Sequence, residues 1–357
     1  MPNLDPLDQQ LLHVLQQPLP LVAEPFAAIA QRVGLSPAET LRRITLLRHG
    51  AAPAGGGVIR QISAIFDSRS LGYQSLLVAA KIPPEQLEAA AAVINQHPGV
   101  SHNYQRNHAY NLWYTLALPP DSRLGLQRTL EILQQTSGAL AMRPLPSIRM
   151  YKIGVKFDVG GGGGGDEVDT PPVAPATGRP TAAIGTAAPY QLTEQERVLI
   201  RLLQQDLPLV EHPFDDWAKE AGLSTPELLA AAQRFLDLGL MRRFSAVLRH
   251  RAAGIVANAM GVWEVPPEQQ ESFGQTASGF AQVSHCYARP TFEDWPYSLF
   301  TMVHATTPAE CESILAEISR VTGMTRYSAL YSTREFKKVR VKYFTGDIEA
   351  WEQAHQG

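Results

Sequence analysis

The chain contains an internal duplication, and this feature limits its possible folds more than any other. Residues 4–50 recur at residues 192–239. The first copy includes Gln16-Gln-Pro-Leu-Pro-Leu-Val-Ala-Glu-Pro-Phe26, and the second includes Gln204-Gln-Asp-Leu-Pro-Leu-Val-Glu-His-Pro-Phe214, an offset of 188 residues (204 minus 16). A match over dozens of positions indicates a repeated folding unit. We therefore expect the 357 residues to form two related halves.

Each copy begins with a pattern that predicts three short helices. In the first half these cover residues 9–16, 26–33 and 37–50, and in the second half residues 194–204, 214–221 and 225–239. Ser36 and Ser224 stand where an N-cap is needed, and Gly50 and Gly239 where a C-cap is needed. Three short helices with a glycine-containing turn are typical of a winged helix-turn-helix.

A second unit follows the helices in each half. Hairpin segments are expected at residues 58–68 and 241–250. A strand (73–82 or 255–265), a helix (83–97 or 266–278), two strands, a helix (121–137 or 307–322) and a last strand come next. The third of these elements carries the motif described below, and the fourth covers residues 111–117 or 297–305. The last strand is predicted to end at Val155-Lys-Phe157 or Val341-Lys-Tyr343. The order β-α-β-β-α-β is ferredoxin-like, so the fold class is α+β.

The two halves are joined by a segment with little that could be buried. Residues 160–190 contain six consecutive glycines, Gly160 to Gly165, and several prolines. This composition is typical of a flexible linker that keeps two domains at high effective concentration. The predicted domains are two helix-turn-helix units (1–57 and 191–240), two ferredoxin-like units (58–159 and 241–346) and the linker (160–190).

One motif occurs in both halves at the third predicted element of the ferredoxin-like unit. It reads Val100-Ser-His-Asn-Tyr-Gln-Arg106 and Val283-Ser-His-Cys-Tyr-Ala-Arg289. Because side chains alternate along a strand, the histidine, tyrosine and arginine of each copy share one face. Arginine binds carboxylates as a fork, and histidine exchanges protons near neutral pH. Such a strand suits a pocket for a large anionic ligand.

Composition and sequence termini exclude several other classes of protein. The net charge of −3 argues against a broadly basic nucleic-acid binder. Cys286 and Cys311 form no CxxC pair, which argues against a disulfide framework, a zinc site or an iron–sulfur cluster. Neither a signal peptide nor a stretch long enough to span a membrane is recognisable, so a cytoplasmic location is expected.

The predicted architecture resembles the Lrp/AsnC family of regulators, and the detailed motifs resemble a narrower branch, the siroheme decarboxylases. Those enzymes are made of two related subunits. The first half is similar to one subunit in Ile65-Phe-Asp-Ser-Arg-Ser-Leu-Gly-Tyr73 and in residues 102–114. The second half is similar to the other subunit in residues 242–251 and 284–300. The resemblance covers nearly all of the chain except the linker and about the last dozen residues, and it implies a fusion of both subunits.

The resemblance implies a carboxy-lyase that acts on siroheme in heme d1 or alternative heme biosynthesis. The C12 and C18 acetate side chains would lose CO₂ and become methyl groups, which gives 12,18-didecarboxysiroheme. No cofactor beyond the iron tetrapyrrole substrate is implied. The two halves would pair as a pseudo-heterodimer, and two chains could associate further as a homodimer.

His102 and His285 are the candidate catalytic residues, as proton donors or as groups that position the reacting acetate. The simpler alternative for each is a half-buried strand histidine with a satisfied hydrogen bond. The other candidates would bind the carboxylates of siroheme or, for His108 and His250, could instead ligate its iron. These substrate-binding candidates are Tyr104, Arg106, His108, Arg243, Arg249, His250, Arg251, Tyr287 and Arg289.

Three further features bear on the predicted pocket. Trp113 and Trp295 could stack on the macrocycle, although core packing is the simpler explanation for Trp113. Residues 294–297 extend the second copy and could form a loop over the pocket. Lys338, Arg340 and Lys342 alternate along the last predicted strand, where a solvated edge is the plainer interpretation.

Two rival functions remain. A ligand-responsive transcriptional regulator would read DNA with the third helix of each helix-turn-helix unit. Residues 36–48 contain three arginines, but residues 224–237 contain one arginine and two acidic residues, so DNA binding is not expected. A non-catalytic haem sensor or carrier would use the same pocket without turnover.

Overall fold

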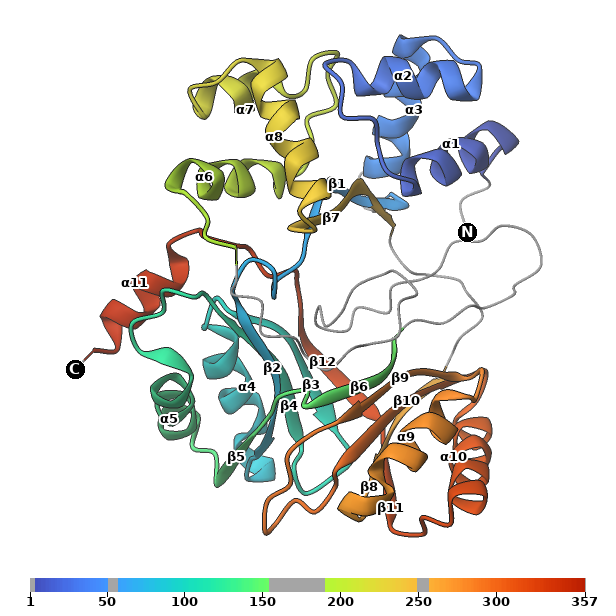
Figure 1. Ribbon diagram of the computed structural model, residues 1–357, viewed down its shortest axis with the longest axis vertical. Coiled ribbons are helices and arrows are strands. Elements are labelled where there is room, and N and C mark those ends of the chain that lie inside the picture. The colour runs from blue at the N-terminus through green and yellow to red at the C-terminus, as the bar shows by residue number, and fades with distance from the viewer. Residues whose placement is uncertain (1–3, 51–56, 154–189, 249–256, 357) are drawn as a thin grey trace.

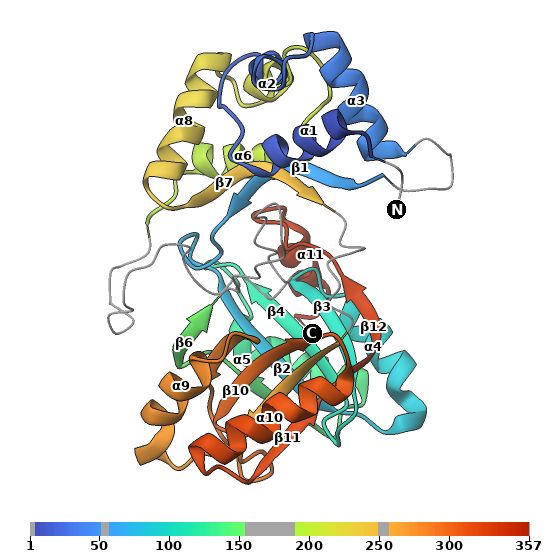
Figure 2. The ribbon, with the colours of Figure 1, turned by 90° about the vertical axis from the view of Figure 1, so that its right-hand side faces the viewer.

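The computed structural model describes residues 4–50, 57–153, 190–248 and 257–356, so most of the predicted linker and the candidates Arg249, His250 and Arg251 lie outside the described residues. Figures 1 and 2 show the six helix-turn-helix helices at one end of the molecule and two sheets with their covering helices at the other. None of the helices in these four ranges is long and apolar enough to cross a membrane.

The helix-turn-helix units form as predicted. The first comprises α1 (Pro6–Gln16), α2 (Pro25–Val33) and α3 (Pro37–His49), and the second α6 (Glu194–Leu203), α7 (Asp215–Glu220) and α8 (Thr225–Asp237). Ser36 Oγ accepts a hydrogen bond from the backbone N–H of Glu39, and Ser224 forms a capping box with Glu227. The apolar faces of both units merge into one hydrophobic core.

The predicted hairpin segments are wrong in their pairing. Each supplies one strand, β1 (Ile59–Phe66) or β7 (Met241–Leu248), and these two strands pair antiparallel with each other across the halves. Side chains of each strand alternate between the two faces of this sheet. The face with Ile62 and Phe244 at its centre packs into the shared helical core. Pairing between halves therefore buries both apolar faces under one two-stranded sheet.

The β-α-β-β-α-β order is confirmed in both halves. The first sheet contains β2 (Gln74–Lys81), β3 (Val100–Arg106), β4 (Leu112–Leu118) and β5 (Ala141–Leu145), with α4 (Leu87–Asn95) and α5 (Gly125–Ser137). The second contains β8 (Ala257–Trp263), β9 (Val283–Ala288), β10 (Leu299–Ala305) and β11 (Tyr327–Leu330), with α9 (Gln270–Ser278) and α10 (Pro308–Thr322). Figure 1 shows the helices on the outer faces, so the sheets face each other.

The predicted last strand of each half is instead two strands, and the second of them crosses to the other half. β6 (Arg149–Ile153) pairs with β9 at the edge of the second sheet, and β12 (Ser332–Lys338) pairs with β3 at the edge of the first. β12 ends at Lys338 rather than at Tyr343, and residues 154–157 lie outside the described ranges. Pro146, which has no N–H to donate to a ladder, lies between the two strands of the first half.

Side chains anchor the exchanged strands to the half that receives them. The Nζ of Lys152 on β6 donates to the carbonyl of Phe280 just after α9, at 2.7 Å. The Nζ of Lys337 on β12 donates to the carbonyl of Asn95 at the end of α4, also at 2.7 Å. The ring of Tyr151 lies so close to Gly274 that a Cβ there would come within 2.4 Å of it. The two halves are thus interlocked in both directions.

A last helix, α11 (Asp347–Ala354), follows the predicted second ferredoxin-like unit and packs on the first half. The ring centroids of Trp351 and His97 are 4.4 Å apart. The buried carboxylate of Glu352 accepts hydrogen bonds from Ser122 Oγ and from the backbone N–H of Arg123. The end of the second half therefore covers the first half a second time, after β12.

Candidate active site

The two motif strands, β3 and β9, place their histidine, tyrosine and arginine on one face each, as predicted. The ring centroids of His102 and Tyr104 are 6.2 Å apart, and those of His285 and Tyr287 are 5.9 Å apart. Residues between them point the other way, because Cys286 packs with the helices that cover the second sheet. Both candidate faces are therefore turned toward the opposite sheet, in the interior of the molecule.

The arginines of the motif make reciprocal contacts between the halves. Arg106 donates to the carbonyl of Leu330 at 3.2 Å, and Arg289 donates to the carbonyl of Leu145. Burial lowers the pKa of each guanidinium to about 10, so both stay charged at neutral pH. The Nε of each is buried and has no hydrogen-bond partner within the described part of the chain. The arginine stands four positions after the histidine, roughly 13 Å along a strand, so the two ends of the motif face different surroundings.

A β-bulge lies at the Ser-His pair of both motifs. In β3, Val100 pairs with Leu116 and His102 with Thr115, which leaves Ser101 as the extra residue. In β9, Val283 and His285 pair with adjacent residues of β10, which leaves Ser284 in the same position. A bulge re-aims a side chain, and here it turns the serine toward the histidine. Simple alternation along a strand predicts these serines on the opposite face, so their contact with the histidines is not visible in the sequence pattern.

The bulged serine holds one nitrogen of each histidine. Ser101 Oγ lies 2.9 Å from His102 Nδ1, and Ser284 Oγ lies 2.7 Å from His285 Nδ1. Because Nδ1 is held by the serine, Nε2 is the nitrogen of each ring that can address a ligand. Two imidazoles are thus oriented in the same way by equivalent backbone irregularities.

The second half adds a histidine that sequence reasoning missed. His304 on β10 is 3% exposed, and its Nε2 lies 2.7 Å from Ser284 Oγ. Burial and the neighbouring His304 lower the pKa of His285 to about 4, and burial also lowers the pKa of His304. Both rings are therefore neutral at pH 7 in the ligand-free protein. The available signal was the position of His304 on the strand that pairs with the motif.

The face of the β1–β7 sheet that points away from the helical core carries polar side chains beside the apolar Ile65 and Val247. Ser63 and Ser245 are direct partners across this sheet, and both side chains are fully buried. Neither hydroxyl has a hydrogen-bond partner among the described residues. The predicted candidate Arg243 lies on the same face of β7, two residues before Ser245. This face presents hydroxyl and guanidinium donors suited to carboxylates.

Comparison with known proteins gives a family for this arrangement. The AsnC-like ligand binding domain family matches residues 70–152 and 252–337, and the siroheme decarboxylase NirDL-like HTH domain family matches residues 8–51 and 196–242. A siroheme decarboxylase of Hydrogenobacter thermophilus is 41% identical over 342 residues, which covers 96% of each chain. The chain belongs to the siroheme decarboxylase family.

Single subunits and a solved structure of this family also match. A siroheme decarboxylase beta subunit of Methanosarcina barkeri is 46% identical over 40% of this chain and 95% of its own. An alpha subunit of Desulfovibrio desulfuricans is 39% identical over 43% of this chain and 84% of its own. The crystal structure of siroheme decarboxylase NirDL in co-complex with an iron-uroporphyrin III analogue has a TM-score of 0.74 and 35% identity, and covers 97% of both chains.

Within this siroheme decarboxylase family member, His108 lies apart from the two motif histidines. It follows β3 at the end opposite to His102, and its Nδ1 accepts the backbone N–H of Tyr110 at 3.0 Å. Its half-buried ring packs against Trp295, with centroids 5.3 Å apart, and burial lowers its pKa. The structure therefore does not bring His108 together with His102.

The two tryptophans that could stack on a macrocycle are core residues. Trp113 and Trp295 are at most 1% exposed, and their ring centroids are 5.3 Å apart between the two sheets. Asp294 accepts two hydrogen bonds of 2.8 Å from Arg143 and one of 2.6 Å from Tyr110, both in the first half. The 294–297 extension thus ties the halves together, and its place over the pocket stays a prediction.

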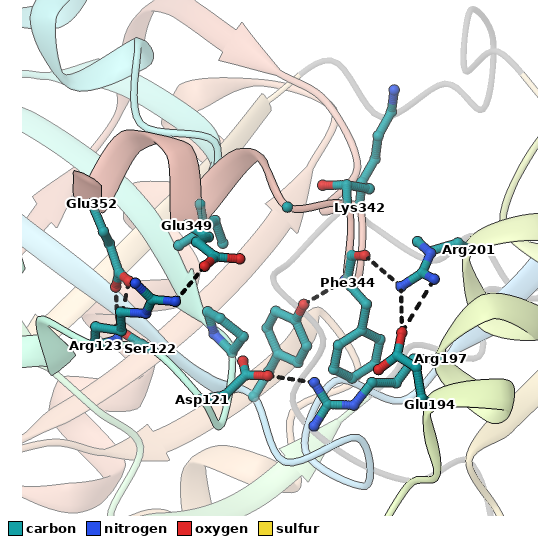
Figure 3. A pocket seen from close by; sticks show the side chains of 15 residues that line it. Asp121, Ser122, Arg123, Glu194, Arg197, Arg201, Lys342, Phe344, Glu349 and Glu352 are labelled. Atoms are coloured by element: carbon teal, nitrogen blue, oxygen red, sulfur yellow. Dashed lines mark hydrogen bonds and ion pairs between the residues drawn. The ribbon is translucent and has the colours of Figure 1, made fainter. Parts of the chain in front are cut away.

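A separate hollow of about 540 Å³ lies between α6, α11 and the turn before α5 (Figure 3). Its lining is charged, but the charges are paired within the wall, as in Arg197 with Asp121 and Arg123 with Glu349. No histidine is among the described residues that line it. The motif histidines, which can exchange protons, therefore remain the better candidate site of the decarboxylase.

Proposed function

We propose that this chain is a siroheme decarboxylase that converts siroheme to 12,18-didecarboxysiroheme and two CO₂, as a carboxy-lyase. The observation that carries the proposal is the pair of serine-held histidines in the interior between two interlocked halves. The solved relative with an iron-uroporphyrin III analogue supports an iron tetrapyrrole as the ligand. The substrate iron is the sole metal in this proposal, and no separate cofactor takes part.

Binding of siroheme requires cationic and hydroxyl groups around its eight carboxylates. Lys338 on the exchanged strand β12 is the direct cross-strand partner of His102, so its side chain lies on the same face. Arg243 and the buried hydroxyls of Ser63 and Ser245 would contact further carboxylates from the β1–β7 sheet. Tyr104 and Tyr287, beside the two histidines, would bind propionates through their phenol groups.

The roles proposed for other predicted residues rest on the sequence. Arg249 and Arg251 keep their predicted role in binding carboxylates. His250 keeps its predicted role as a ligand of the iron or of a carboxylate. Arg106 and Arg289 would add positive charge at the far end of each motif strand, where each already ties the two sheets together. His108 keeps its predicted role as an alternative iron or carboxylate ligand.

The reaction needs one proton for each carboxylate that leaves. The bond between the methylene carbon and the carboxylate breaks, its electron pair stays with the methylene carbon and the ring, and a proton from a histidine completes the methyl group. Nε2 of His102 would serve one acetate and Nε2 of His285 the other. Carboxylates brought next to buried imidazoles favour the charged ring, so binding itself should raise the pKa values of the histidines.

We also propose that the helix-turn-helix units do not read DNA. Arg42 and Arg43 on α3 both pair with Glu39, and Arg43 also pairs with Asp5 and Asp8. Arg48 at the end of α3 pairs with Asp206 of the second half. A DNA-binding helix needs unneutralised cations to replace counterions on the phosphates. These units are better explained as supports that hold the β1–β7 sheet, and the halves as a pseudo-heterodimer within one chain.

Anaerobic incubation of the purified chain with siroheme, followed by mass spectrometry, tests the proposed activity. We expect loss of two CO₂ per siroheme. Tight binding without a change in mass would favour a haem sensor or carrier instead. Absence of binding, combined with salt-sensitive binding to duplex DNA, would favour the regulator.

A further inference from the structure

We propose that Ser284 and His304 form a proton relay that supplies His285, and that the first half has no such relay for His102. This inference rests on the proposed decarboxylase function and adds positioning residues to it. It predicts that the two decarboxylations differ in their dependence on buried histidines, although the two motifs read alike.

The geometry of the relay is complete within two adjacent strands. Ser284 Oγ lies 2.7 Å from His285 Nδ1 and 2.7 Å from His304 Nε2. The hydroxyl also lies 3.3 Å from the carbonyl oxygen of Met302, which gives its proton a resting acceptor. A hydroxyl between two imidazoles can accept a proton from one and donate to the other, because it carries one hydrogen and two lone pairs.

The equivalent position in the first half differs in chemistry. Ser101 Oγ lies 2.7 Å from the hydroxyl of Thr115, which also accepts the backbone N–H of His102. Threonine can fix the serine, but it cannot hold an extra proton near neutral pH. Among the described residues, the first half therefore retains the positioning function, and Ser101 is bonded to a threonine hydroxyl where Ser284 is bonded to a second imidazole.

Three other titratable side chains in the described part of this region, those of Tyr287, Cys286 and Lys152, are poorly suited to provide this proton. Tyr287, on the same face, has a pKa that burial raises further above its ordinary value. Cys286 points into the helix-covered core, and the Nζ of Lys152 on the neighbouring β6 is engaged by the carbonyl of Phe280. Among the described residues, the imidazole of His304 is the titratable group bonded to Ser284.

The step balances with one proton taken from solvent as the anionic substrate binds. His304 in its imidazolium form releases its Nε2 proton to Ser284 Oγ, while the serine hydroxyl passes its proton to His285 Nδ1. His285 at the same time releases its Nε2 proton to the carbanionic methylene carbon. Both rings end neutral, the serine is unchanged, and one C–H bond has replaced one C–C bond.

The test compares His304→Gln with the matched first-half variant Thr115→Val. Glutamine keeps a hydrogen-bonding side chain but cannot titrate. We expect His304→Gln to bind siroheme within about twofold of the parent chain and to accumulate a product that has lost one CO₂. The step served by His285 should slow at least tenfold and lose its pH dependence above pH 6, since proton transfer groups typically contribute 10²–10⁴-fold. Thr115→Val should not reproduce this pH effect.

A second pair of variants separates the relay from simple positioning. Ser284→Thr keeps the hydroxyl and should retain most of the rate of the step served by His285. Ser284→Ala should slow this step as His304→Gln does. Equal slowing of both steps, or unchanged rates in His304→Gln with intact siroheme binding and melting, would overturn the relay. A parent chain that releases no CO₂ would instead overturn the proposed function, so the two failures are distinguishable.

Discussion

The two motif strands have the same sequence pattern and the same bulge, yet they lie in different surroundings. His102 is next to Lys338 of β12, and its serine is fixed by Thr115. His285 is next to Ile153 of β6 in the ladder, and its serine is bonded to His304. The duplication has kept the backbone device that orients each imidazole. The neighbouring strands have diverged, and they determine the charge around each ring.

The neighbouring edge strand of each site comes from the opposite half. β12 belongs to the second half but borders His102, and β6 belongs to the first half but borders His285. Neither half alone can therefore complete its own site. Relatives named as single beta or alpha subunits match about 40% of this chain each, which agrees with a chain built from two halves.

Removal of each motif histidine should give the largest effects and the sharpest comparison. We expect His102→Ala and His285→Ala each to slow one decarboxylation by 10²–10⁴-fold, because each removes one proton donor. Mass spectrometry of the products should show loss of one CO₂ in each case, at different acetates. The double variant should still bind siroheme but release no CO₂. Full double decarboxylation by either single variant would refute the assignment of one histidine to each acetate.

The next test breaks the strand exchange on one side. Gly274→Ala places a Cβ against the ring of Tyr151, with no space for it, and overpacking of this kind destabilises by about 1–3 kcal/mol. We expect β6 to be displaced, so the step served by His285 should be lost before the step served by His102. Gly279→Ala, just after the same helix, is the matched control, because its Cβ would meet only the Thr276 carbonyl at 3.2 Å. Denaturant unfolding and product analysis report both effects.

The sequence was sufficient for the repeated units and for the faces of the motif strands, because these depend on local periodicity. Alternation placed His102 and His285 correctly, and the serine caps of α3 and α8 formed as expected. Pairing between distant segments could not be read in this way. The partners of β1, β6 and β12 all lie in the other half. Which partner a strand takes depends on which apolar faces are buried together.

The candidate site shows the same limit. A bulge changes the face of one side chain, so strict alternation hid the contact between Ser284 and His285. His304 is a single histidine on an apolar strand, and its significance depends on the register with β9. The two tryptophans were ambiguous for a related reason: burial between the sheets depends on how the halves face each other.

Acid should destabilise the folded chain through His285 over a defined range of pH. The folded-state pKa of His285 is about 4, below the value of about 6.5 for an unfolded histidine. The contribution of neutral His285 to the free energy of unfolding is therefore fully present above pH 6.5. It falls as the pH decreases toward 4, because in this range only the unfolded chain takes up the proton. The contribution is of order 1–3 kcal/mol.

Denaturant unfolding between pH 7 and pH 4 measures this effect. His285→Gln should flatten part of the pH dependence. The remainder should include contributions from His97, whose pKa burial lowers to about 3, and from His108 and His304, whose pKa values burial also lowers. His97→Gln is the matched control in the first half. An unchanged pH profile in His285→Gln would contradict a buried neutral imidazole at this position.

The smallest effect is expected where both halves contribute the same residue. Ser63 and Ser245 are paired across the β1–β7 sheet, and their fully buried hydroxyls have no hydrogen-bond partner in the part of the chain that the structure describes. An unsatisfied hydroxyl costs about 1 kcal/mol or more. Ser63→Ala and Ser245→Ala should therefore raise the melting temperature of the ligand-free chain. They should also weaken siroheme binding by about fivefold each, because the hydroxyls would bind carboxylates. Ser313→Ala, on the exposed face of α10, should change neither quantity. A gain in stability without a loss of affinity would mean that these hydroxyls do not contact the substrate. Arg243 would then be the described residue of the β1–β7 sheet proposed to bind a carboxylate.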